Sequence, residues 1–285
     1  MKSDAPIRNV SDTALWVAMY RARESERPDA VFHDPLARRL AGDRGEQIVA
    51  AMRHQDRNAW AYVARTFLFD SFVSERVFDG VDLVVNLAAG LDTRPYRMDL
   101  PPELRWVEVD LPDILAYKEE LLAGETPRCR VERVAADLSD GETRRSLLAR
   151  LAAESRRAPV LSEGLLVYLT AEEALGLGRD LSSHRAFHWW AFDIASPPLL
   201  KMMQKQVGAS LDRANAPLQF APVEGPWYFE PAGWRVLDVR GSLKTAAKLD
   251  RLSFLFRLVA KFPEKPRGGK QIWAGTCLLE NVRSG

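Results

Sequence analysis

The chain has few of the side chains that build metal centres and disulfide frameworks. Its 285 residues include two cysteines, Cys129 and Cys277, and four histidines. Neither cysteine has another Cys or a His nearby at the spacing of a metal-ligand set. We therefore expect no structural zinc site, no other metal site and no disulfide framework.

The chain also lacks a large excess of positive or negative charge, and it lacks long apolar runs. The 40 basic and 39 acidic residues leave a net charge of +1 at pH 7, so no global field attracts nucleic acid or an anionic membrane. No apolar run approaches the length of a membrane span, and residues 1–14 lack the apolar core of a signal peptide. We expect a cytoplasmic protein without a membrane span or a nucleic-acid partner; the composition leaves the oligomeric state open.

A buried strand running into a turn of small residues is the most informative feature that is present. Residues 83–97 read LVVNLAAGLDTRPYR, and the apolar run at their start fits a parallel strand that is covered on both faces. Ala88, Ala89 and Gly90 then let the backbone approach a ligand closely, at the place where doubly wound α/β sheets bind one. This pattern predicts a nucleotide-like cofactor, with an ordinary strand-to-loop turn as the alternative.

Acidic residues end the next three predicted strands. Because parallel strands present their carboxyl ends at one edge of a sheet, we expect these acids to gather beside the small-residue turn. An acid about twenty residues beyond such a turn is placed to bond a ribose hydroxyl. The acids are Glu108 and Asp110 on strand 104–110, Asp137 after strand 131–136, and Glu163 after strand 158–162.

Helices precede this sheet and an unusually long connection interrupts its far half. Residues 11–79 read as helices, and the helix from Asn58 is apolar nearly all round, so it must be buried. Further strands are predicted at residues 187–194, 234–239 and 272–279. Residues 196–233 exceed a normal connection and predict a lid or binding insertion, with a helix at 197–208 and a loop at 222–231.

An amphipathic helix is predicted at residues 244–261. Its apolar side carries Leu249, Leu252, Phe256 and Val259, and its other sides carry Lys and Arg. Two readings are open: a solvated helix packed on the sheet, or a helix that binds a membrane surface or a partner.

Four segments carry a family resemblance. NLAAGLDTRPYR, VEVDLP with Lys118 close behind, AADLSD and SEGLLVYLT occur in this order at a characteristic spacing. They resemble the leucine carboxyl methyltransferase family, in its bacterial branch of class I S-adenosylmethionine (SAM)-dependent O-methyltransferases. The resemblance runs from MYRARES to the Gly233-Trp234 pair. One departure is Ala88, where many members have the first glycine; cofactor binding is expected to survive if this position does not need a positive φ.

The resemblance implies one Rossmann-like domain over residues 1–285. Its seven-stranded, mostly parallel, doubly wound sheet would carry an N-terminal helical cap (1–79), a cofactor-binding core (80–195), a lid insertion (196–233) and C-terminal strands with a helix (234–285). SAM would be the cofactor and S-adenosylhomocysteine the product.

The resemblance also distributes the chemical groups of SAM over the predicted pocket. The resemblance implies that Arg65 and Arg23 bind the carboxylate of SAM. The alternative for Arg65 is an ordinary ion pair, and the alternative for Arg23 is a solvated charge on a helix. The ammonium of SAM falls to backbone carbonyls around Gly90 and to Glu163. Ala88 belongs to the same turn.

The ribose and adenine ends have their own candidates. Glu108 and Asp110 compete for the ribose diol, and the pattern does not choose between them. Asp137 and the backbone of Leu138 would meet the adenine. Asp92 either belongs to the site or caps the short helix that follows it.

Methyl transfer places the acceptor, the methyl carbon and sulfur in line, so the protein mainly orients and desolvates. A carboxylate acceptor needs no base, whereas an alcohol or phenol usually does. None of the four histidines is a persuasive base. Tyr168 matches a family tyrosine near the transferred methyl and, with Arg65, would orient a substrate carboxylate; simple packing is the alternative.

The predicted function is SAM-dependent O-methylation of a carboxylate or hydroxyl group on a small molecule, with secondary metabolites as a candidate class. An acceptor with an apolar or aromatic part would suit the aromatic residues around the insertion. An NAD(P)-dependent oxidoreductase is one alternative, although the turn lacks G-x-G-x-x-G. A catalytically silent SAM-binding module is the other. The aromatic residues are Trp189, Trp190, Trp227, Tyr228 and Phe229.

Overall fold

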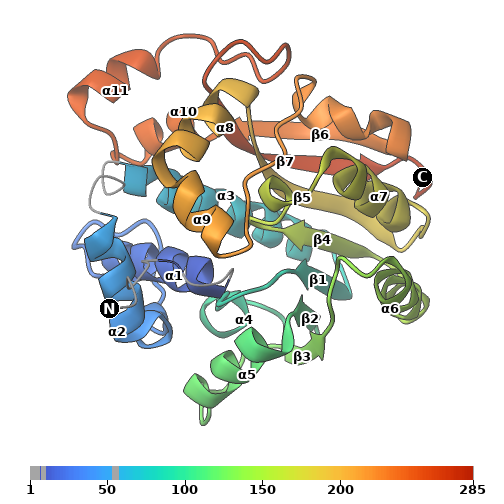
Figure 1. The fold of residues 1–285 in the computed structure, drawn as a ribbon. Coiled ribbons are helices and arrows are strands. Elements are labelled where there is room, and N and C mark those ends of the chain that lie inside the picture. The colour runs from blue at the N-terminus through green and yellow to red at the C-terminus, as the bar shows by residue number, and fades with distance from the viewer. Residues whose placement is uncertain (1–6, 8–10, 53–57, 285) are drawn as a thin grey trace.

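Seven strands form one sheet at the centre of the molecule (Figure 1). The structure is a computed structural model that describes residue 7, residues 11–52 and residues 58–284. The strand order is β3-β2-β1-β4-β5-β7-β6, and β7 runs antiparallel to both of its neighbours while the other pairings are parallel. The expected Rossmann-like, mostly parallel sheet is therefore confirmed.

The strands and helices follow the predicted order along the chain. The strands are β1 (Leu83–Leu87), β2 (Arg105–Asp110), β3 (Arg130–Ala135), β4 (Ala158–Ser162), β5 (Phe187–Ala195), β6 (Trp234–Gly241) and β7 (Ala274–Asn281). The helices of the first half are α1 (Ser11–Ser25), α2 (Ala37–Ala51), α3 (Ala59–Phe78), α4 (Arg94–Arg97), α5 (Pro112–Leu121) and α6 (Gly141–Ala153). Those of the second half are η2 (Leu166–Tyr168), α7 (Ala171–Ser182), α8 (Pro197–Met203), η3 (Gln204–Gly208), α9 (Ala209–Arg213), η4 (Gly225–Ala232), α10 (Ser242–Lys248) and α11 (Phe254–Val259).

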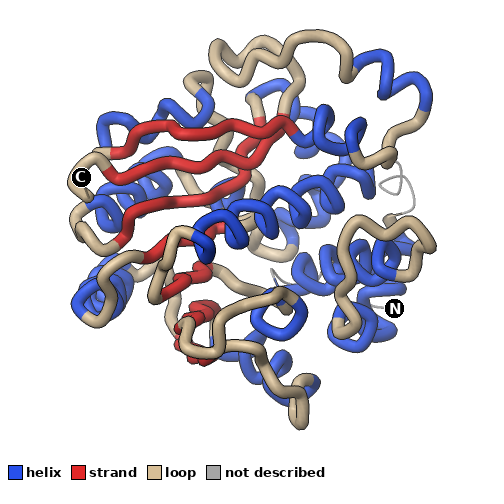
Figure 2. Tube along the Cα trace, turned by 180° about the vertical axis from the view of Figure 1, so that it is seen from behind, coloured by secondary structure: helices blue, strands red, loops and turns tan. Residues whose placement is uncertain are grey.

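Helices cover both faces of the sheet, and β1 shows how its sequence serves both. Val84 belongs to a core with Phe69 and Phe72 of α3, and the view from behind shows helices in front of the strands on this side of the sheet (Figure 2). Val85 points to the opposite face, in a core that includes Leu148 of α6 and Leu177 of α7. Because both faces are buried, all five residues of β1 are buried and its sequence does not alternate.

A helical cap stands over the carboxyl ends of the strands. Met19 of α1 and Leu40 of α2 share an apolar core with Ile114 of α5 and Leu211 of α9. The cap therefore joins the N-terminal helices to the insertion after β5. Helix α2 is broken at Gly42, whose φ of 55° only glycine adopts readily.

Two local predictions are wrong. Residues 222–231, expected as a loop, include the 3₁₀ helix η4. Residues 244–261 do not form one helix, because the chain breaks between α10 and α11, where Asp250 adopts a left-handed φ of 57°. Helix α11 has no buried residue, so it does not pack on the sheet as a solvated amphipathic helix would. Within the described ranges, no helix is long and apolar enough to cross a membrane.

Candidate functional site

A cavity of about 790 Å³ opens at the carboxyl ends of the central strands. Its walls come from α1 and α3 of the cap, from the residues that follow β1, β2, β4 and β5, and from the segments around α8, α9 and α11. This volume lies in the range of small-molecule sites, which is roughly 300–1,000 Å³. The sheet edge predicted to bind a ligand therefore does form a wall of a ligand-sized cavity.

The turn after β1 brings backbone to the cavity in a strained conformation. Ala88 has φ of 53° and Gly90 has φ of 49°. The condition under which alanine would be harmless at position 88 is thus not met, because this position does adopt a positive φ. A Cβ atom added to Gly90 would lie 3.3 Å from the Cβ atom of Ala14 in α1. Small residues here let the cap and the turn meet at the cavity wall.

Asp110, at the end of β2, lines the cavity beside this turn. One carboxylate oxygen accepts a hydrogen bond from the N–H of Gly90 at 2.6 Å, and the other accepts one from Leu111 at 2.8 Å. Burial raises the pKa of Asp110 above its ordinary value, although these two N–H groups act in the opposite direction. Each oxygen keeps a lone pair that can accept a further hydrogen bond.

Glu108 is excluded from the same task by its surroundings. Its side chain is fully buried, and its two oxygens accept from Lys118 at 2.7 Å and from Arg133 at 3.0 Å. Glu108 and Asp110 are two residues apart on β2 and lie on the same face of the sheet, but Glu108 is enclosed by these two basic side chains and does not line the cavity. Of the two acids between which the sequence left the ribose role open, Asp110 lines the cavity and Glu108 does not.

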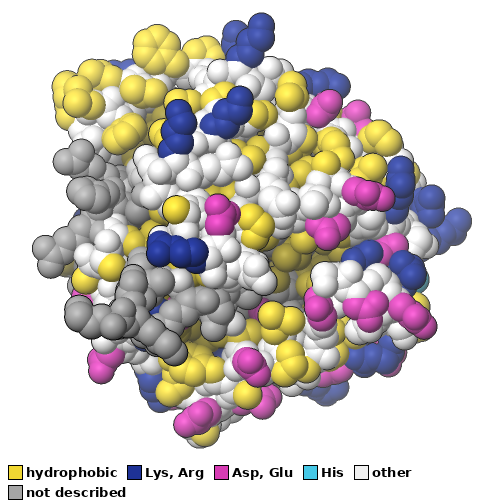
Figure 3. Space-filling view, viewed as in Figure 1, with side chains coloured by type: hydrophobic (Ala, Val, Ile, Leu, Met, Phe, Trp, Pro, Cys, Tyr) yellow, Lys and Arg dark blue, Asp and Glu magenta, His cyan; other side chains and the backbone are white. Residues whose placement is uncertain are grey.

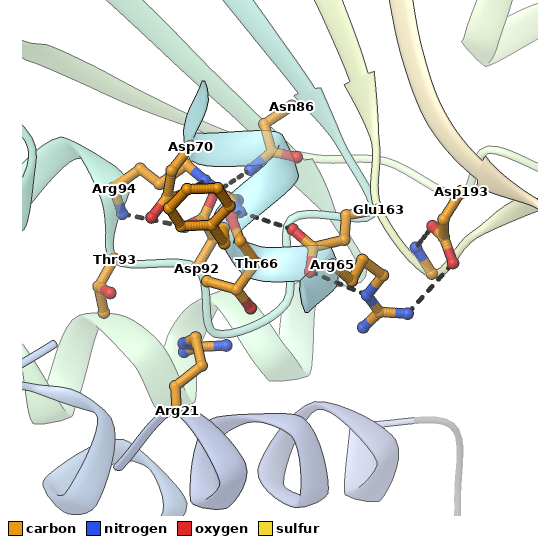
Figure 4. A network of polar contacts seen from close by, with 12 residues as sticks. Arg21, Arg65, Thr66, Asp70, Asn86, Asp92, Thr93, Arg94, Glu163 and Asp193 are labelled. Carbon is orange, nitrogen blue, oxygen red and sulfur yellow. Dashed lines mark hydrogen bonds and ion pairs between the residues drawn. The ribbon is translucent and has the colours of Figure 1, made fainter. Parts of the chain in front are cut away.

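Ion pairs connect α3 and α4 to the strand ends (Figure 4). Glu163, after β4, accepts from Arg65 of α3 at 3.1 Å and from Arg94 of α4 at 2.8 Å. Arg65 also donates to Asp193, near the end of β5, at 3.2 Å. Arg94 pairs in addition with Asp92 at 2.9 Å. The two guanidinium groups thus hold three strand-end carboxylates along one wall.

These pairs decide the protonation states in the wall. Burial opposes ionisation of Asp92, but the charges of Arg94, Lys118 and Arg97 and the backbone N–H of Arg94 together outweigh it and hold the pKa of Asp92 well below its usual range. The pKa of Glu163 is lowered in the same way by Arg94 and Arg65, against its burial. The pKa of Arg65 is raised by Asp193 and Glu163, which outweigh its burial. Both acids are therefore ionised near neutral pH.

Asp92 is positioned for both of the roles that its sequence position allowed. It lines the cavity, and it also accepts a hydrogen bond from the backbone N–H of Arg94 at the start of α4. The side-chain amide of Asn86, at the end of β1, donates to it at 2.7 Å. Capping the short helix and facing the cavity are thus compatible.

The charge of this wall suits a cationic ligand. Asp92, Glu163 and Asp193 together with Asp110 outnumber the cavity-lining guanidinium groups of Arg65, Arg94 and Arg21. SAM carries a sulfonium, an ammonium and a carboxylate, so it has a net positive charge. Carboxylates beside the turn can accept from a ribose diol and an ammonium, and guanidinium groups can bind a carboxylate. The residues present fit the cofactor.

The arginine of α1 that reaches the cavity is Arg21, not Arg23. Arg23 donates to Glu46 at 3.1 Å on the outside of the cap and does not line the cavity. Arg21, two residues earlier, donates to Asp34 at 2.8 Å and to the carbonyl of Leu91 at 2.5 Å. Residues two apart on a helix point in different directions, so the position of Arg23 does not support its predicted role.

The adenine prediction is not supported by position either. Asp137 is exposed after β3, where it accepts from the N–H and hydroxyl groups of Ser139, and the carbonyl of Leu138 accepts from Arg144. Neither Asp137 nor Leu138 lines the cavity. Sequence reasoning also missed Asp193, which lines the cavity and lies near the end of a predicted strand, where the strand-end rule covers it.

Tyr168 lines the cavity from the short helix η2 after β4. Its hydroxyl is hydrogen-bonded to the side chain of Thr13 in α1, and burial raises its pKa despite this bond. The phenol is therefore neutral near pH 7 and serves as a hydrogen-bonding group, not as a base. The described lining of the cavity contains no histidine; His54 lies outside the described residues.

The far part of the cavity is apolar. Met202 and Met203 of α8, Val207 of η3 and Phe220 line it from the insertion. Flexible thioether side chains adapt to irregular apolar ligands. The site therefore combines a charged end at the strands with an apolar end under the insertion.

Comparison with known proteins shows which family has this arrangement. The family model described as leucine carboxyl methyltransferase matches residues 14–181, more than half of the chain. A protein of Parafrankia sp. (strain EAN1pec) is 42% identical over 185 residues, which are 61% of this chain and 59% of that protein. The chain thus spans less than two thirds of this relative's length. A Frankia alni protein is 31% identical over 84% of this chain and 88% of its own length. Both carry the name of S-adenosyl-L-methionine-dependent methyltransferases.

Two solved structures share the fold. A DUF574 family protein from Streptomyces avermitilis superposes with a TM-score of 0.60 at 16% identity, over 93% of this chain and 96% of its own. A Thermobifida fusca protein named as a methyltransferase gives 0.57 at 19% identity, over 98% and 96%. With its matching sequence model, its related sequences and the shared sheet, the chain belongs to the leucine carboxyl methyltransferase family, whose relatives are named for SAM as cofactor.

Proposed function

We propose that this protein transfers a methyl group from SAM to an oxygen atom of a small molecule with an apolar part. The observation that carries the proposal is the cavity itself, which has an excess of strand-end carboxylates at one end and an apolar lining at the other. When bound, SAM supplies a methyl group whose carbon–sulfur bond breaks as the acceptor oxygen attacks, with the electron pair passing to sulfur.

The chain's own residues would bind and orient. Asp110 would accept from the ribose hydroxyls, because it lies beside the turn with acceptor capacity to spare. Glu163 would accept from the ammonium, and Arg65 or Arg21 would bind the carboxylate. A guanidinium has five N–H donors, more than the ion pairs of Arg65 with Glu163 and Asp193 use. Preformed polar groups of this kind need no reorganisation when ligand binds.

The acceptor is proposed to be a carboxylate. Asp92 and Glu163 have lowered pKa values, and Tyr168 has a raised one, so none of these groups is a good proton acceptor near pH 7. An acceptor that is already ionised needs no such group. Tyr168 would then orient the acceptor by a hydrogen bond, and the insertion at residues 196–233 would cover it as a lid.

SAM binding by the purified chain tests the cofactor assignment. Calorimetry should show that Asp110→Asn weakens SAM binding by more than about tenfold, since a hydrogen bond to a charged group is worth about 1.5–3 kcal/mol. Asp113→Asn is the matched control, because Asp113 is exposed on α5 and does not line the cavity. Equal SAM affinity of both variants would contradict the ribose role. A preference of the unaltered chain for NAD or NADP over SAM would contradict the transferase assignment.

The kind of acceptor can be read from the product. SAM with a labelled methyl group is offered with a panel of aliphatic and aromatic carboxylic acids and with the matched alcohols and phenols. A methyl ester releases labelled methanol in mild alkali, whereas a methyl ether does not. Label that enters the acids and is released by alkali supports a carboxylate acceptor; alkali-stable label on an alcohol or phenol would refute it.

A further inference from the structure

Exposed apolar side chains are concentrated in one segment, residues 254–272. Of the eleven exposed large hydrophobic side chains among the described residues, seven lie in these nineteen positions. Phe254 and Leu255 of α11 are 74% and 73% exposed. Figure 3 shows hydrophobic side chains gathered over α11, at the upper left. Single exposed apolar residues are common, but a cluster of this kind marks an interaction surface. The seven are Phe254, Leu255, Phe256, Leu258, Val259, Phe262 and Ile272.

Positive charge is concentrated in the same segment. It contains five exposed basic residues, and its one acidic residue, Glu264, is half-buried. The whole chain has a net charge of only +1, so the near balance of the sequence conceals a local excess. Arg257 is paired with Asp250 at 3.2 Å, which partly neutralises it. The five are Arg257, Lys261, Lys265, Arg267 and Lys270.

The surface adjoins the apolar part of the cavity. Phe256, Val259, Phe262 and Ile272 line the cavity and are exposed at the surface as well. A surface that binds lipid at residues 254–272 would therefore place the cavity beside that lipid.

We propose that residues 254–272, the docking segment, bind the surface of an anionic lipid bilayer. The combination of apolar side chains with Lys and Arg is the one that inserts among acyl chains and attracts acidic headgroups. A second copy of the chain fits less well, because a two-fold interface would bring the same basic residues face to face. The docking segment binds peripherally and needs no membrane-spanning helix.

Because the cavity adjoins the docking segment, lipid binding would also determine which acceptors reach the cavity. The acceptor would be an amphiphile with a long apolar part that passes from the lipid surface into the cavity, with its oxygen end toward the strands. This part of the inference rests on the proposed function; the binding of lipid does not.

Flotation of the full chain with vesicles tests the docking segment. Vesicles of phosphatidylcholine with phosphatidylglycerol should carry the protein, and vesicles of phosphatidylcholine alone should carry much less. High salt should weaken the binding, because salt screens exposed charges. Lys261→Glu with Lys265→Glu should weaken binding to anionic vesicles by at least about 25-fold, since each basic residue near such a surface contributes about a factor of five and the new carboxylates are repelled.

A second pair of substitutions tests the apolar part. Phe254→Ser with Leu255→Ser changes side chains that are largely exposed and do not line the cavity, so the fold and the SAM site should be unaffected. Vesicle binding should fall at least tenfold. Phe78→Ser with Arg185→Glu is the matched control, because these exposed residues lie outside the docking segment; this variant should bind vesicles like the unaltered chain.

The outcomes separate the docking segment from the transferase. SAM affinity is measured by calorimetry on the same preparations. A chain that binds SAM but does not float with anionic vesicles refutes the docking segment alone, and a chain that floats but does not bind SAM refutes the proposed function alone. Equal binding to both kinds of vesicle refutes the anionic preference. Dimers in solution that the Phe254 and Leu255 substitutions dissociate would identify a second copy as the occupant and overturn the proposal.

Discussion

Replacing Ala88 by glycine should stabilise the protein, although glycine substitutions usually destabilise. Ala88 holds φ of 53° at the turn after β1. An L-residue with a Cβ pays about 1–2 kcal/mol for this left-handed conformation, and glycine does not. Glycine also makes the unfolded chain more flexible, at a cost of about 0.4–1 kcal/mol. The balance is a gain of roughly 0.5–1 kcal/mol in the free energy of unfolding.

Ala89 provides the matched control in the next position. It does not have a positive φ, and its side chain is buried. Ala89→Gly therefore relieves no strain. It removes a buried methyl group, which lowers the free energy of unfolding by about 0.8 kcal/mol. The greater flexibility of the unfolded chain lowers it by about 0.4–1 kcal/mol more. The free energies of unfolding of the two variants should differ by about 2 kcal/mol. Ala88→Gly should be more stable than the unaltered chain, and Ala89→Gly should be less stable.

Equilibrium unfolding in urea measures this difference directly. Far-ultraviolet circular dichroism and tryptophan fluorescence should give coincident transitions, so that one free energy describes each variant. If Ala88→Gly and Ala89→Gly lose the same stability, the left-handed strain assigned to Ala88 is absent. SAM affinity of Ala88→Gly, measured beside it, reports whether the relieved turn still presents its backbone to the ligand.

Three further results are expected. Tyr168→Phe should leave SAM affinity nearly unchanged and lower turnover, because it removes the hydroxyl that is bonded to Thr13 and proposed to orient the acceptor; full turnover would leave packing as its role. Residues 196–233 should exchange amide hydrogens more slowly when S-adenosylhomocysteine and a long-chain carboxylic acid are both bound, and equal protection in both states would exclude a lid. The melting temperature should fall as the pH drops below the ordinary pKa values of 3.8 for Asp and 4.5 for Glu. The reason is that Asp34, Asp92 and Glu163 have lowered pKa values in the folded protein, and their stabilising charge is lost as the pH falls toward these lowered values. A level melting temperature from pH 5 to pH 3 would contradict this.

The fold was predictable because its signals are local and repeated. The apolar run of β1 and the alternation of strands with helices each follow from burial on two faces. The break between α10 and α11 was not predictable in this way. The apolar residues of this segment, Leu249, Leu252, Phe256 and Val259, have the spacing of one helix. The left-handed φ of Asp250 ends the helical path between α10 and α11, and a hydropathy pattern carries no information about φ.

The site was predictable in part because strand ends meet, whichever residues they carry. This rule placed Asp110 and Glu163 at the cavity. It could not say which of two acids on the same face reaches the cavity, and Glu108, two residues before Asp110, is enclosed in a buried pair with Lys118. Helix rotation had the same effect on Arg21 and Arg23. Choosing between such neighbours requires the positions of the packing partners, which the sequence spacing does not supply.

The ion pairs explain how one wall can hold so many carboxylates without closing the cavity. Arg65 lies on α3, in the helical layer, yet it pairs with Glu163 and Asp193 on the sheet edge. Breaking either pair would leave a buried charge uncompensated, which is costly, so cap and sheet are held in one relative position. The same pairs keep the acids ionised before any ligand arrives. A cationic ligand then meets negative charge that is already oriented, and binding requires no proton to leave the protein.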